Sequence, residues 1–268
     1  MELDKTLEKL KSDAPLVHAI TNNVTVNDCA NITLAIGASP AMCESTEEVY
    51  DFVSLSKALY VNVGTLTGEQ QKAIEIAVSR ASEIGVPVVL DPVGAVALKN
   101  RQKLILNLLT KYNIACLKGN ISEIKCLTGR STEAKGVDSL DHGEDALEAA
   151  KELSLEYDTT VVATGKTDFI AQKNKSYSVD NGSPLLGRIT GSGCMLGIIT
   201  AAFLGTTKDN DNIQACLAGT TAMGIAGEKA QKHLQSENDL GTFRIKLFDS
   251  MASLRGEELK SRAKYQKL

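Results

Sequence analysis

The stretch TGSGCMLGIITAAFLG, residues 190–205, joins a glycine-rich turn to an almost unbroken apolar run. Apolar residues on every side of a helical turn predict a helix that is buried all round. Gly191 and Gly193 let the backbone of the turn approach a ligand closely. A helix beginning near Cys194 would point its free N–H groups and its positive dipole end at the same place. The stretch therefore predicts a buried helix with an anion site at its N-terminus.

Cys194 stands at this predicted anion site. A helix dipole favours thiolate over thiol, so we expect its pKa to lie below the value of about 8.5 for a free cysteine. Such a thiolate can accept a proton from an attacking alcohol, while fixed backbone donors stabilise charge on a transferred phosphoryl group. The alternative is that Cys194 is only a small apolar residue at the start of a helix.

Strand-like apolar runs alternate with stretches of helical periodicity, for example residues 65–85 and 101–112, before the glycine-rich turn is reached. This alternation predicts a parallel sheet covered by helices on both faces, a three-layer α/β/α fold. The expected strands lie at residues 15–20, 58–64, 86–91, 114–119 and 159–164.

The pattern changes in the C-terminal part of the chain. Residues 167–182 read as two short strands around a turn, which predicts an antiparallel hairpin added to the sheet. After the hairpin the sequence predicts only helices, at residues 193–205 and 211–234 and from about Gly241 onward.

No linker, low-complexity segment or internal repeat interrupts the chain, so we expect one domain spanning residues 1–268. Residues 129–145, rich in Gly, Asp and Ser, are the candidate for a mobile loop.

The formal net charge of -4 argues against a non-specific nucleic-acid binder. The basic stretch at residues 255–268 contains glutamates at helical spacing, which favours a solvated terminal helix over a binding patch. No apolar run reaches the ~20 residues that span a bilayer, and residues 1–16 are charged and amphipathic, unlike a secretory signal. We therefore expect a cytoplasmic protein without nucleic-acid or membrane partners.

Six cysteines lie far apart, with no C-x-x-C pair and no histidine at zinc-ligand spacing, which predicts reduced thiols. The five cysteines other than Cys194 stand in apolar surroundings, where cysteine behaves as a small core hydrophobe. These five are Cys29, Cys43, Cys116, Cys126 and Cys216.

Polar residues follow the expected strands, and in open parallel sheets ligands bind at the carboxyl ends of the strands. Asn22 and Asn23 come after the first strand, where helix capping or a polar pocket explains them equally well. Thr164 ends the fifth strand and could let a nucleotide phosphate approach the backbone. The Walker phosphate loop is excluded because Thr160 stands where that motif needs glycine.

Charged residues follow the third and fourth strands. Asp91 stands where a lone aspartate commonly caps a turn, and Asn120 and Glu123 have the spacing of a capping box. The functional alternative is that Lys118 meets a phosphate while Asn120 and Glu123, with Asp91, hold Mg²⁺, an ion bound by few carboxylates plus phosphates. The residues alone leave both interpretations open.

The order of these motifs resembles the ribokinase-like superfamily and, within it, the hydroxyethylthiazole kinase family of thiamine biosynthesis. The resemblance runs from about Val17 to Gly205. It implies phosphoryl transfer from ATP, with Mg²⁺, to the primary alcohol of 5-(2-hydroxyethyl)-4-methylthiazole. The motifs are ITNNVT (20–25), GASPAM (37–42), VGTL (63–66), LDPVGA (90–95), GNxxE (119–123), ATG (163–165) and GSGC (191–194).

The resemblance also implies roles for single residues. Cys194 would be the catalytic base, where related sugar kinases carry aspartate. Many relatives carry arginine where Lys118 stands, and lysine binds phosphate as a point charge without the bidentate fork. The other implied roles are thiazole binding by Met42, Gly191, Asn22 and Asn23, ATP binding by Lys118, Thr164, Asn120 and Gly193, and metal binding by Asp91 and Glu123.

The resemblance further implies a homotrimer with active sites at subunit interfaces, so that Met42 would serve a neighbour's site. From the residues alone, GASPAM (37–42) reads as an apolar loop of small residues that suits a pocket wall or core packing equally.

Three other functions fit parts of the sequence. A pyrimidine or pyridoxal alcohol kinase would need the same phosphate machinery. A cysteine-nucleophile hydrolase needs a histidine partner, but His18 lies in the expected first strand, His142 in the polar loop and His233 at a helix end. A non-catalytic nucleotide-binding protein would show a degraded glycine-rich turn, and here the turn is intact.

Overall fold

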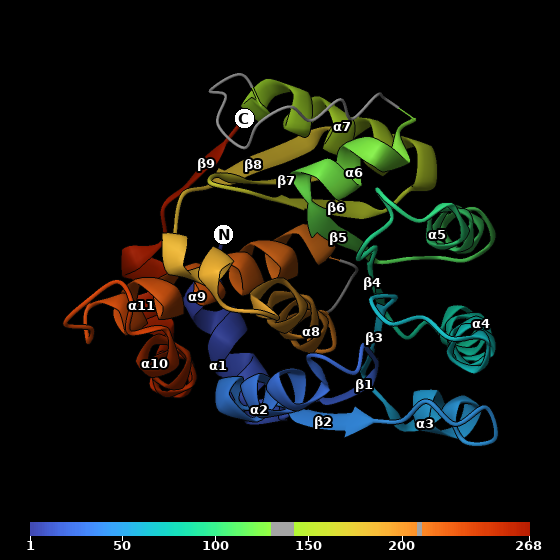
Figure 1. Ribbon diagram of the computed structural model, residues 1–268, viewed down its shortest axis with the longest axis horizontal. Helices are drawn as coiled ribbons and strands as arrows, with labels where there is room; N and C mark the ends of the chain where they lie inside the picture. Colours follow the sequence, from blue (N-terminus) through green and yellow to red (C-terminus); the bar gives the residue numbers. More distant parts are fainter. Residues whose placement is uncertain (130–141, 208–210) are drawn as a thin grey trace.

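The computed structural model describes residues 1–129, 142–207 and 211–268 (Figure 1). Most of the loop expected at 129–145 falls in the first gap, outside the described residues, and its last residues, 142–145, are helical rather than part of a loop.

A single sheet runs through the described residues in the order β2-β1-β3-β4-β5-β6-β7-β8-β9. The strands from β2 to β6 pair in parallel, and β7, β8 and β9 extend the sheet in antiparallel pairing. The strands are β1 Leu16–Ile20, β2 Ser39–Met42, β3 Ala58–Asn62, β4 Val88–Asp91, β5 Cys116–Asn120, β6 Thr160–Thr164, β7 Asp168–Gln172, β8 Lys175–Val179 and β9 Tyr265–Lys267.

Helices cover both faces of this sheet (Figure 1). One hydrophobic core cluster is formed by the sheet together with α1, α2 and α8 to α11, and a second is formed by the sheet together with α3 to α7. The helices are α1 Leu3–Asp13, α2 Val26–Ile36, α3 Val49–Leu55, α4 Gly68–Ile84, α5 Lys99–Lys111, α6 Ile121–Leu127, α7 His142–Tyr157, the 3-10 helix η1 Pro184–Arg188, α8 Ser192–Leu204, α9 Asn212–Gln231, α10 Leu240–Ala252 and α11 Gly256–Arg262.

The predicted three-layer α/β/α fold with a mostly parallel sheet and an antiparallel hairpin is confirmed. Each of the five predicted parallel strands overlaps an observed one. They were recognisable because a strand covered on both faces is apolar throughout; β3, for example, is buried at every position.

Two strands were not predicted. Residues 37–42 were expected to form a loop, yet β2 pairs with β1 at the edge of the sheet, where Pro40 is tolerated because an edge strand has an unpaired side. The prediction that only helices follow the hairpin was also wrong. The expected terminal helix is present as α11, but β9 follows it and pairs with β8. A strand this short carries too few residues for a recognisable pattern.

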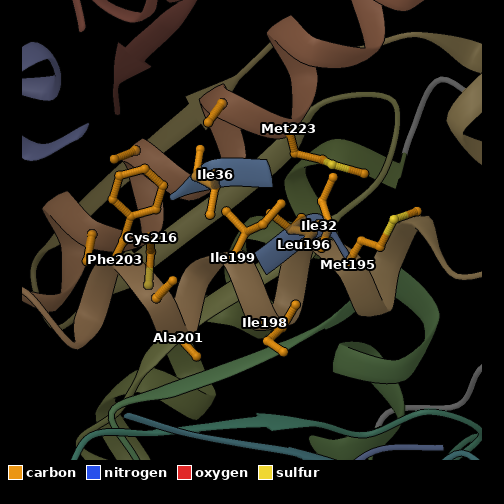
Figure 2. Close-up of a cluster of buried hydrophobic side chains, with 14 of the residues drawn as sticks. Ile32, Ile36, Met195, Leu196, Ile198, Ile199, Ala201, Phe203, Cys216 and Met223 are labelled. Atoms are coloured by element: carbon orange, nitrogen blue, oxygen red, sulfur yellow. The ribbon is translucent and has the colours of Figure 1, made fainter. Parts of the chain in front are cut away.

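The predicted all-round burial of α8 is confirmed from Cys194 to Leu204. The helix packs against α2, α9 and strands β1, β3 and β4, and Figure 2 shows its side chains among those of the neighbouring helices. Gly197 makes this packing possible, because a Cβ there would lie 2.5 Å from the Tyr60 ring of β3. The packing holds the N-terminus of α8 at the carboxyl ends of the strands.

The cysteines are all free thiols, as expected. Four of the five assigned to the core are buried, but Cys126 is partly exposed. Across the described ranges, the helices are too short or too polar for any of them to cross a membrane.

Candidate active site

Cys194 is in the first turn of α8 and is only 9% exposed. Its Sγ lies 3.4 Å from Nδ2 of Asn22, which follows β1, and 3.2 Å from Nδ2 of Asn62, which ends β3. Two amide donors on the sulfur are not what a purely apolar role for this residue would show. The first turn of α8 thus presents a thiol to a polar cluster at the carboxyl ends of two neighbouring strands.

Gly191 is the N-cap residue of α8 and has a φ of 83°, in the left-handed region that favours glycine. A Cβ at this position would lie 2.8 Å from Cγ2 of Thr25. The turn therefore packs directly on the segment that leads into α2. Any side chain at 191 would push the start of α8 away from it.

Lys118 and Asp91 form a buried ion pair next to this turn, with 3.3 Å between Nζ and Oδ2. The hydroxyl of Tyr60 also donates to Oδ2 of Asp91, at 3.0 Å. Burial lowers the pKa of Lys118, but the negative charge of Asp91 and further acidic neighbours outweigh it and raise that pKa. The ammonium group therefore keeps its charge inside the protein.

The ammonium group of Lys118 also lies against the glycine-rich turn. A Cβ on Gly193 would be 3.1 Å from Nζ of Lys118. A fixed positive charge and the free N–H groups of a helix N-terminus thus meet at one place, which is the arrangement that binds phosphate groups. The structure brings together the predicted Cys194, Gly193 and Lys118.

A cavity of about 720 Å³ opens beside this anion site. Its size is in the range of small-molecule binding sites. Thr164 and Gly193, both predicted to bind ATP, line the cavity, and the hydroxyl of Thr164 donates to the carbonyl oxygen of Gly119 at 3.2 Å. Much of the remaining wall comes from the loop after β8 and from α9, including Asn181, Gly182, Ser183, Thr220 and Gly224.

Asn120 and Glu123 form the predicted capping box of α6. The Asn120 side chain accepts from the backbone N–H of Glu123, and Oε2 of Glu123 accepts from that of Asn120, both at 2.9 Å. The other carboxylate oxygen, Oε1, accepts from the backbone N–H of Gly94 at 3.1 Å. Burial and then the charge of Asp91 raise the pKa of Glu123.

The fit of Mg²⁺ can be judged from the donor atoms. Oδ1 of Asp91 is buried without a hydrogen-bond partner, and each oxygen of Glu123 retains a lone pair. Among the described residues, however, no group of three or more His, Cys, Asp or Glu side chains could hold a metal ion. These residues therefore fit an ion held by one or two carboxylates together with phosphate oxygens and water.

Two residues predicted to bind the substrate, Asn23 and Met42, do not belong to the polar cluster around Cys194. Asn23 is exposed, and its backbone N–H donates to the hydroxyl of Thr65 at 3.0 Å. Met42 is half-buried on the edge strand β2 and packs against the core cluster of α2 and α8.

Sequence reasoning missed two residues of the polar cluster, Asn62 and Tyr60. Both are fully buried and belong to the apolar run at residues 58–64. A polar amide at the end of such a run was the available signal, because it breaks an otherwise apolar strand at the ligand-binding edge.

His18 and His233 lie where they were expected, but His142 is the first residue of α7 rather than part of a polar loop. His18 is buried, and its Nε2 lies 2.8 Å from the carbonyl oxygen of Cys43. His233 is exposed just after α9. The side chain of His142 lies outside the described residues. Neither of the two described histidine side chains supports a cysteine–histidine hydrolase.

Solved structures show the class of fold. A ribokinase-like superfamily protein from Enterococcus faecalis V583 superposes with a TM-score of 0.63 over 94% of this chain and 95% of its own, at 13% identity. The hydroxyethylthiazole kinase structure from Pyrococcus horikoshii OT3 superposes with a TM-score of 0.90 over 99% of this chain and 98% of its own, at 34% identity. The fold is therefore that of the ribokinase-like proteins.

Sequence comparison identifies the family. The profile of the hydroxyethylthiazole kinase family matches residues 7–257. The hydroxyethylthiazole kinase of Natranaerobius thermophilus is 56% identical over 267 residues, which is 100% of this chain and 97% of that protein. Hydroxyethylthiazole kinase 1 of Clostridium botulinum strain Okra is 46% identical over 259 residues, 97% of each chain. This chain belongs to the hydroxyethylthiazole kinase family, which confirms the kinase class predicted from the sequence.

Proposed function

We propose that this chain transfers the terminal phosphoryl group of ATP to the primary alcohol of 5-(2-hydroxyethyl)-4-methylthiazole, in thiamine biosynthesis or salvage. The observation that carries the proposal is the first turn of α8, where Cys194 meets the charge of Lys118 beside a cavity large enough for a nucleotide. Membership of the kinase family supports ATP as the co-substrate.

In the proposed reaction, Sγ of Cys194 accepts the proton of the alcohol as its oxygen attacks phosphorus. A new oxygen–phosphorus bond forms, the bond to the β-phosphate oxygen breaks, and ADP leaves. The N–H groups at the start of α8 and the ammonium of Lys118 stabilise the negative charge of the group in transfer. Because these donors are fixed before the reaction, little reorganisation is needed.

Asp91 and Glu123 are the residues that would hold Mg²⁺. When bound, the ion would neutralise charge on the phosphate oxygens. Apart from the ion, the buried pair of Asp91 and Lys118 fixes the ammonium group against the turn. We assign Lys118, Thr164, Asn120 and Gly193 to the nucleotide side, and Gly191, Asn22, Asn23 and Met42 to the thiazole side.

We further propose that the chain works in the cytoplasm as a single-domain protomer of a homotrimer in which Met42 serves a neighbour's site. Two observations support the assembly. Val24 and Leu34, in and beside α2, are exposed apolar side chains, at 64% and 60%. The half-buried β2 packs against α2 at the edge of the sheet. Light scattering of the purified protein would show three times the mass of one chain if the assembly is correct.

The activity is tested by measuring ADP formation from ATP and Mg²⁺ with and without the thiazole alcohol. We expect ADP formation to depend on the alcohol and to equal the amount of thiazole phosphate formed. ATP hydrolysis that is indifferent to the alcohol would contradict the kinase proposal. A parallel panel with pyridoxal and with a hydroxymethylpyrimidine would separate the thiazole kinase from kinases of other alcohols.

A further inference from the structure

We propose that Asn22 and Asn62 are positioning residues that set the reactivity of Cys194, by directing both of their side-chain NH₂ groups at its sulfur. The catalytic consequence rests on the proposed function, but the effect on the thiol itself can be measured without turnover. Nothing in the sequence motifs assigned Asn62 a role, and for Asn22 the positioning role is additional to its proposed place on the thiazole side.

The orientation of Asn22 is fixed by backbone groups on its other side. Its Oδ1 accepts from the backbone N–H groups of Val24 and Thr25, both at 3.1 Å. An NH₂ group cannot accept these bonds, so the flipped amide would set donors against donors. The NH₂ group of Asn22 must therefore face Cys194.

The same reasoning fixes Asn62. Its Oδ1 accepts from the backbone N–H of Gly64 and from Nδ2 of Asn22, both at 2.9 Å. Its NH₂ group faces Sγ of Cys194 on one side and the hydroxyl oxygen of Tyr60, at 2.9 Å, on the other. Every hydrogen of the two NH₂ groups thus has an acceptor, and two of these bonds reach the sulfur.

Burial makes this arrangement matter chemically. Asn22 is 4% exposed and Asn62 fully buried, so little water competes for their hydrogens. A hydrogen bond to the charged form of a group favours that form, and hydrogen bonds act more strongly where water is scarce. A thiolate accepts two N–H donors better than a thiol does. The two amides therefore stabilise the thiolate that the proposed proton transfer needs.

The charged and titratable neighbours of Cys194 come from four elements. Lys118 on β5 favours the thiolate, and its ion-pair partner Asp91 lies on β4. Burial raises the pKa of Tyr60 on β3 far above its usual value and that of Cys29 on α2 to about 12. Tyr60 and Cys29 therefore stay neutral near pH 7, and Cys29 does not compete as a nucleophile.

The test is the pH dependence of Cys194 alkylation by iodoacetamide, followed by peptide mass spectrometry in the full chain. Asn22→Asp and Asn62→Asp each keep the shape of the side chain but replace an NH₂ donor with an oxygen. We expect each change to raise the apparent thiol pKa by about one unit, which lowers the thiolate fraction at pH 7 about tenfold. Asn31→Asp, at an exposed position of α2, controls for added charge and should leave the profile unchanged.

Asn62→Ala provides a second variant without added charge, and thermal unfolding checks that each variant is folded. Thiolate absorbance near 240 nm, compared with Cys194→Ser, gives a readout that needs no reagent to enter the site. Unshifted titration in folded Asn22→Asp, Asn62→Asp and Asn62→Ala would overturn the inference even if the kinase activity is confirmed. A shifted titration in a protein without thiazole kinase activity would keep the inference and remove only the proposed function.

Discussion

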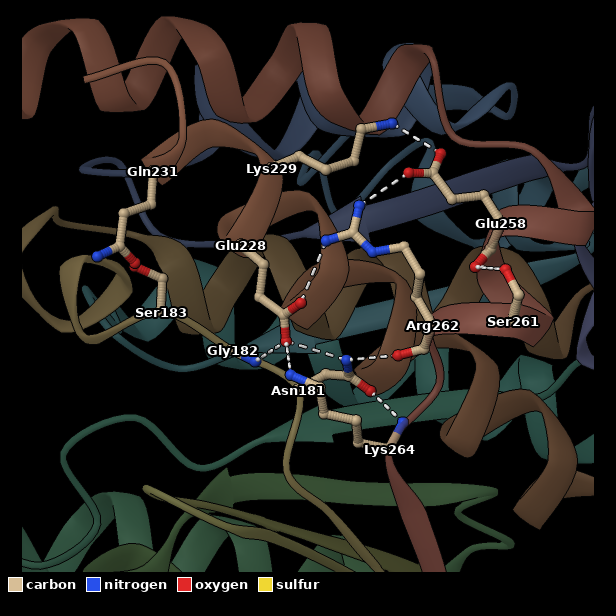
Figure 3. A network of polar contacts seen from close by, with 10 residues as sticks. All are labelled: Asn181, Gly182, Ser183, Glu228, Lys229, Gln231, Glu258, Ser261, Arg262 and Lys264. Carbon is tan, nitrogen blue, oxygen red and sulfur yellow. Dashed lines mark hydrogen bonds and ion pairs between the residues drawn. The ribbon is translucent and has the colours of Figure 1, made fainter. Parts of the chain in front are cut away.

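Two polar networks flank the cavity, and they are built differently. At the start of α8, Cys194 is held by two buried asparagines. At the loop after β8, Glu228 of α9 accepts from Nδ2 of Asn181 at 3.0 Å and from the backbone N–H of Gly182 at 3.3 Å (Figure 3). Glu228 also pairs with Arg262 and Lys264, which ties this wall of the cavity to the C-terminal segment.

The difference lies in charge and water. The Glu228 network relies on ionised side chains, and the side chain of Lys264 is 60% exposed. Ion pairs this exposed contribute at most about 1 kcal/mol each to the stability of the fold. Burial acts to raise the pKa of Glu228, but hydrogen bonds from Lys264 and Asn181 lower it. The amide donors of the Cys194 network are uncharged and buried, so one lost donor leaves a buried group unpaired. The comparison predicts that changes near Cys194 alter reactivity, whereas changes near Glu228 mainly alter nucleotide binding.

The largest expected effect comes from Lys118→Met. This change leaves Asp91 buried without its partner, which should cost about 3–5 kcal/mol of unfolding free energy. It also removes a fixed positive charge from the anion site, so kcat should fall by about 10²-fold or more. Denaturant unfolding and steady-state kinetics measure the two effects. Lys118→Arg, which keeps the charge, should retain activity, and a fully active Lys118→Met would show that the anion site is placed wrongly.

Gly191→Ala should have the next largest effect. A left-handed conformation costs a residue with a Cβ about 1–2 kcal/mol, and here the methyl group would also press on Thr25. We expect a loss of stability of this size and a fall in kcat of about tenfold, because the start of α8 shifts. Gly68→Ala is the matched control, since a Cβ at that helical position meets nothing within 4 Å. Equal stability of the two variants would contradict the packing of the turn.

The pKa of Asp168 and its place in the cavity wall predict that nucleotide binding depends on pH. Burial raises its pKa to about 7, and the residue lines the cavity. The carboxyl group is neutral below this pKa and negative above it, so the KM for ATP should rise as the pH increases from about 6 to about 8. Asp168→Asn keeps an acceptor for the backbone N–H of Gly165 and should flatten the profile. Parallel KM profiles in wild type and variant would argue against this role.

The smallest expected effect comes from Glu228→Gln. Weakening its partly exposed ion pairs should cost about 1 kcal/mol and raise the KM for ATP about twofold, with kcat unchanged. Glu258→Gln is the control, because Glu258 pairs with Lys229 and Arg262 at 2.7 and 2.9 Å and these three residues are not part of the cavity lining. A Glu228→Gln variant that loses kcat while keeping its KM would erase the difference between the two networks.

The sequence predicted the fold where burial dictates the pattern. Strands such as β3 are covered on both faces, so their apolar runs were recognisable without knowledge of the partners. Edge strands lack this constraint. β2 is half-buried and contains Pro40, and β9 has three residues, so neither gave a periodic signal.

The candidate site was predictable only in part. Glycines before a helix and polar residues after strands mark the candidate anion site, which is why Cys194, Lys118 and Thr164 could be predicted as site residues. Asn62 was missed because its role depends on which strand lies beside α8, and that is a consequence of tertiary packing. The capping box of Asn120 and Glu123 was predicted from spacing alone, because a capping box is a local structure.

The most direct test of the account compares kcat for wild type, Cys194→Ala and Cys194→Asp with saturating ATP and thiazole alcohol. If the sulfur is the proton acceptor, alanine should lower kcat by about 10²-fold or more with little change in ATP binding. Aspartate should keep activity, because a carboxylate can accept both the proton and the two amide hydrogen bonds. An alanine variant as fast as wild type would show that the thiol takes no part in the reaction.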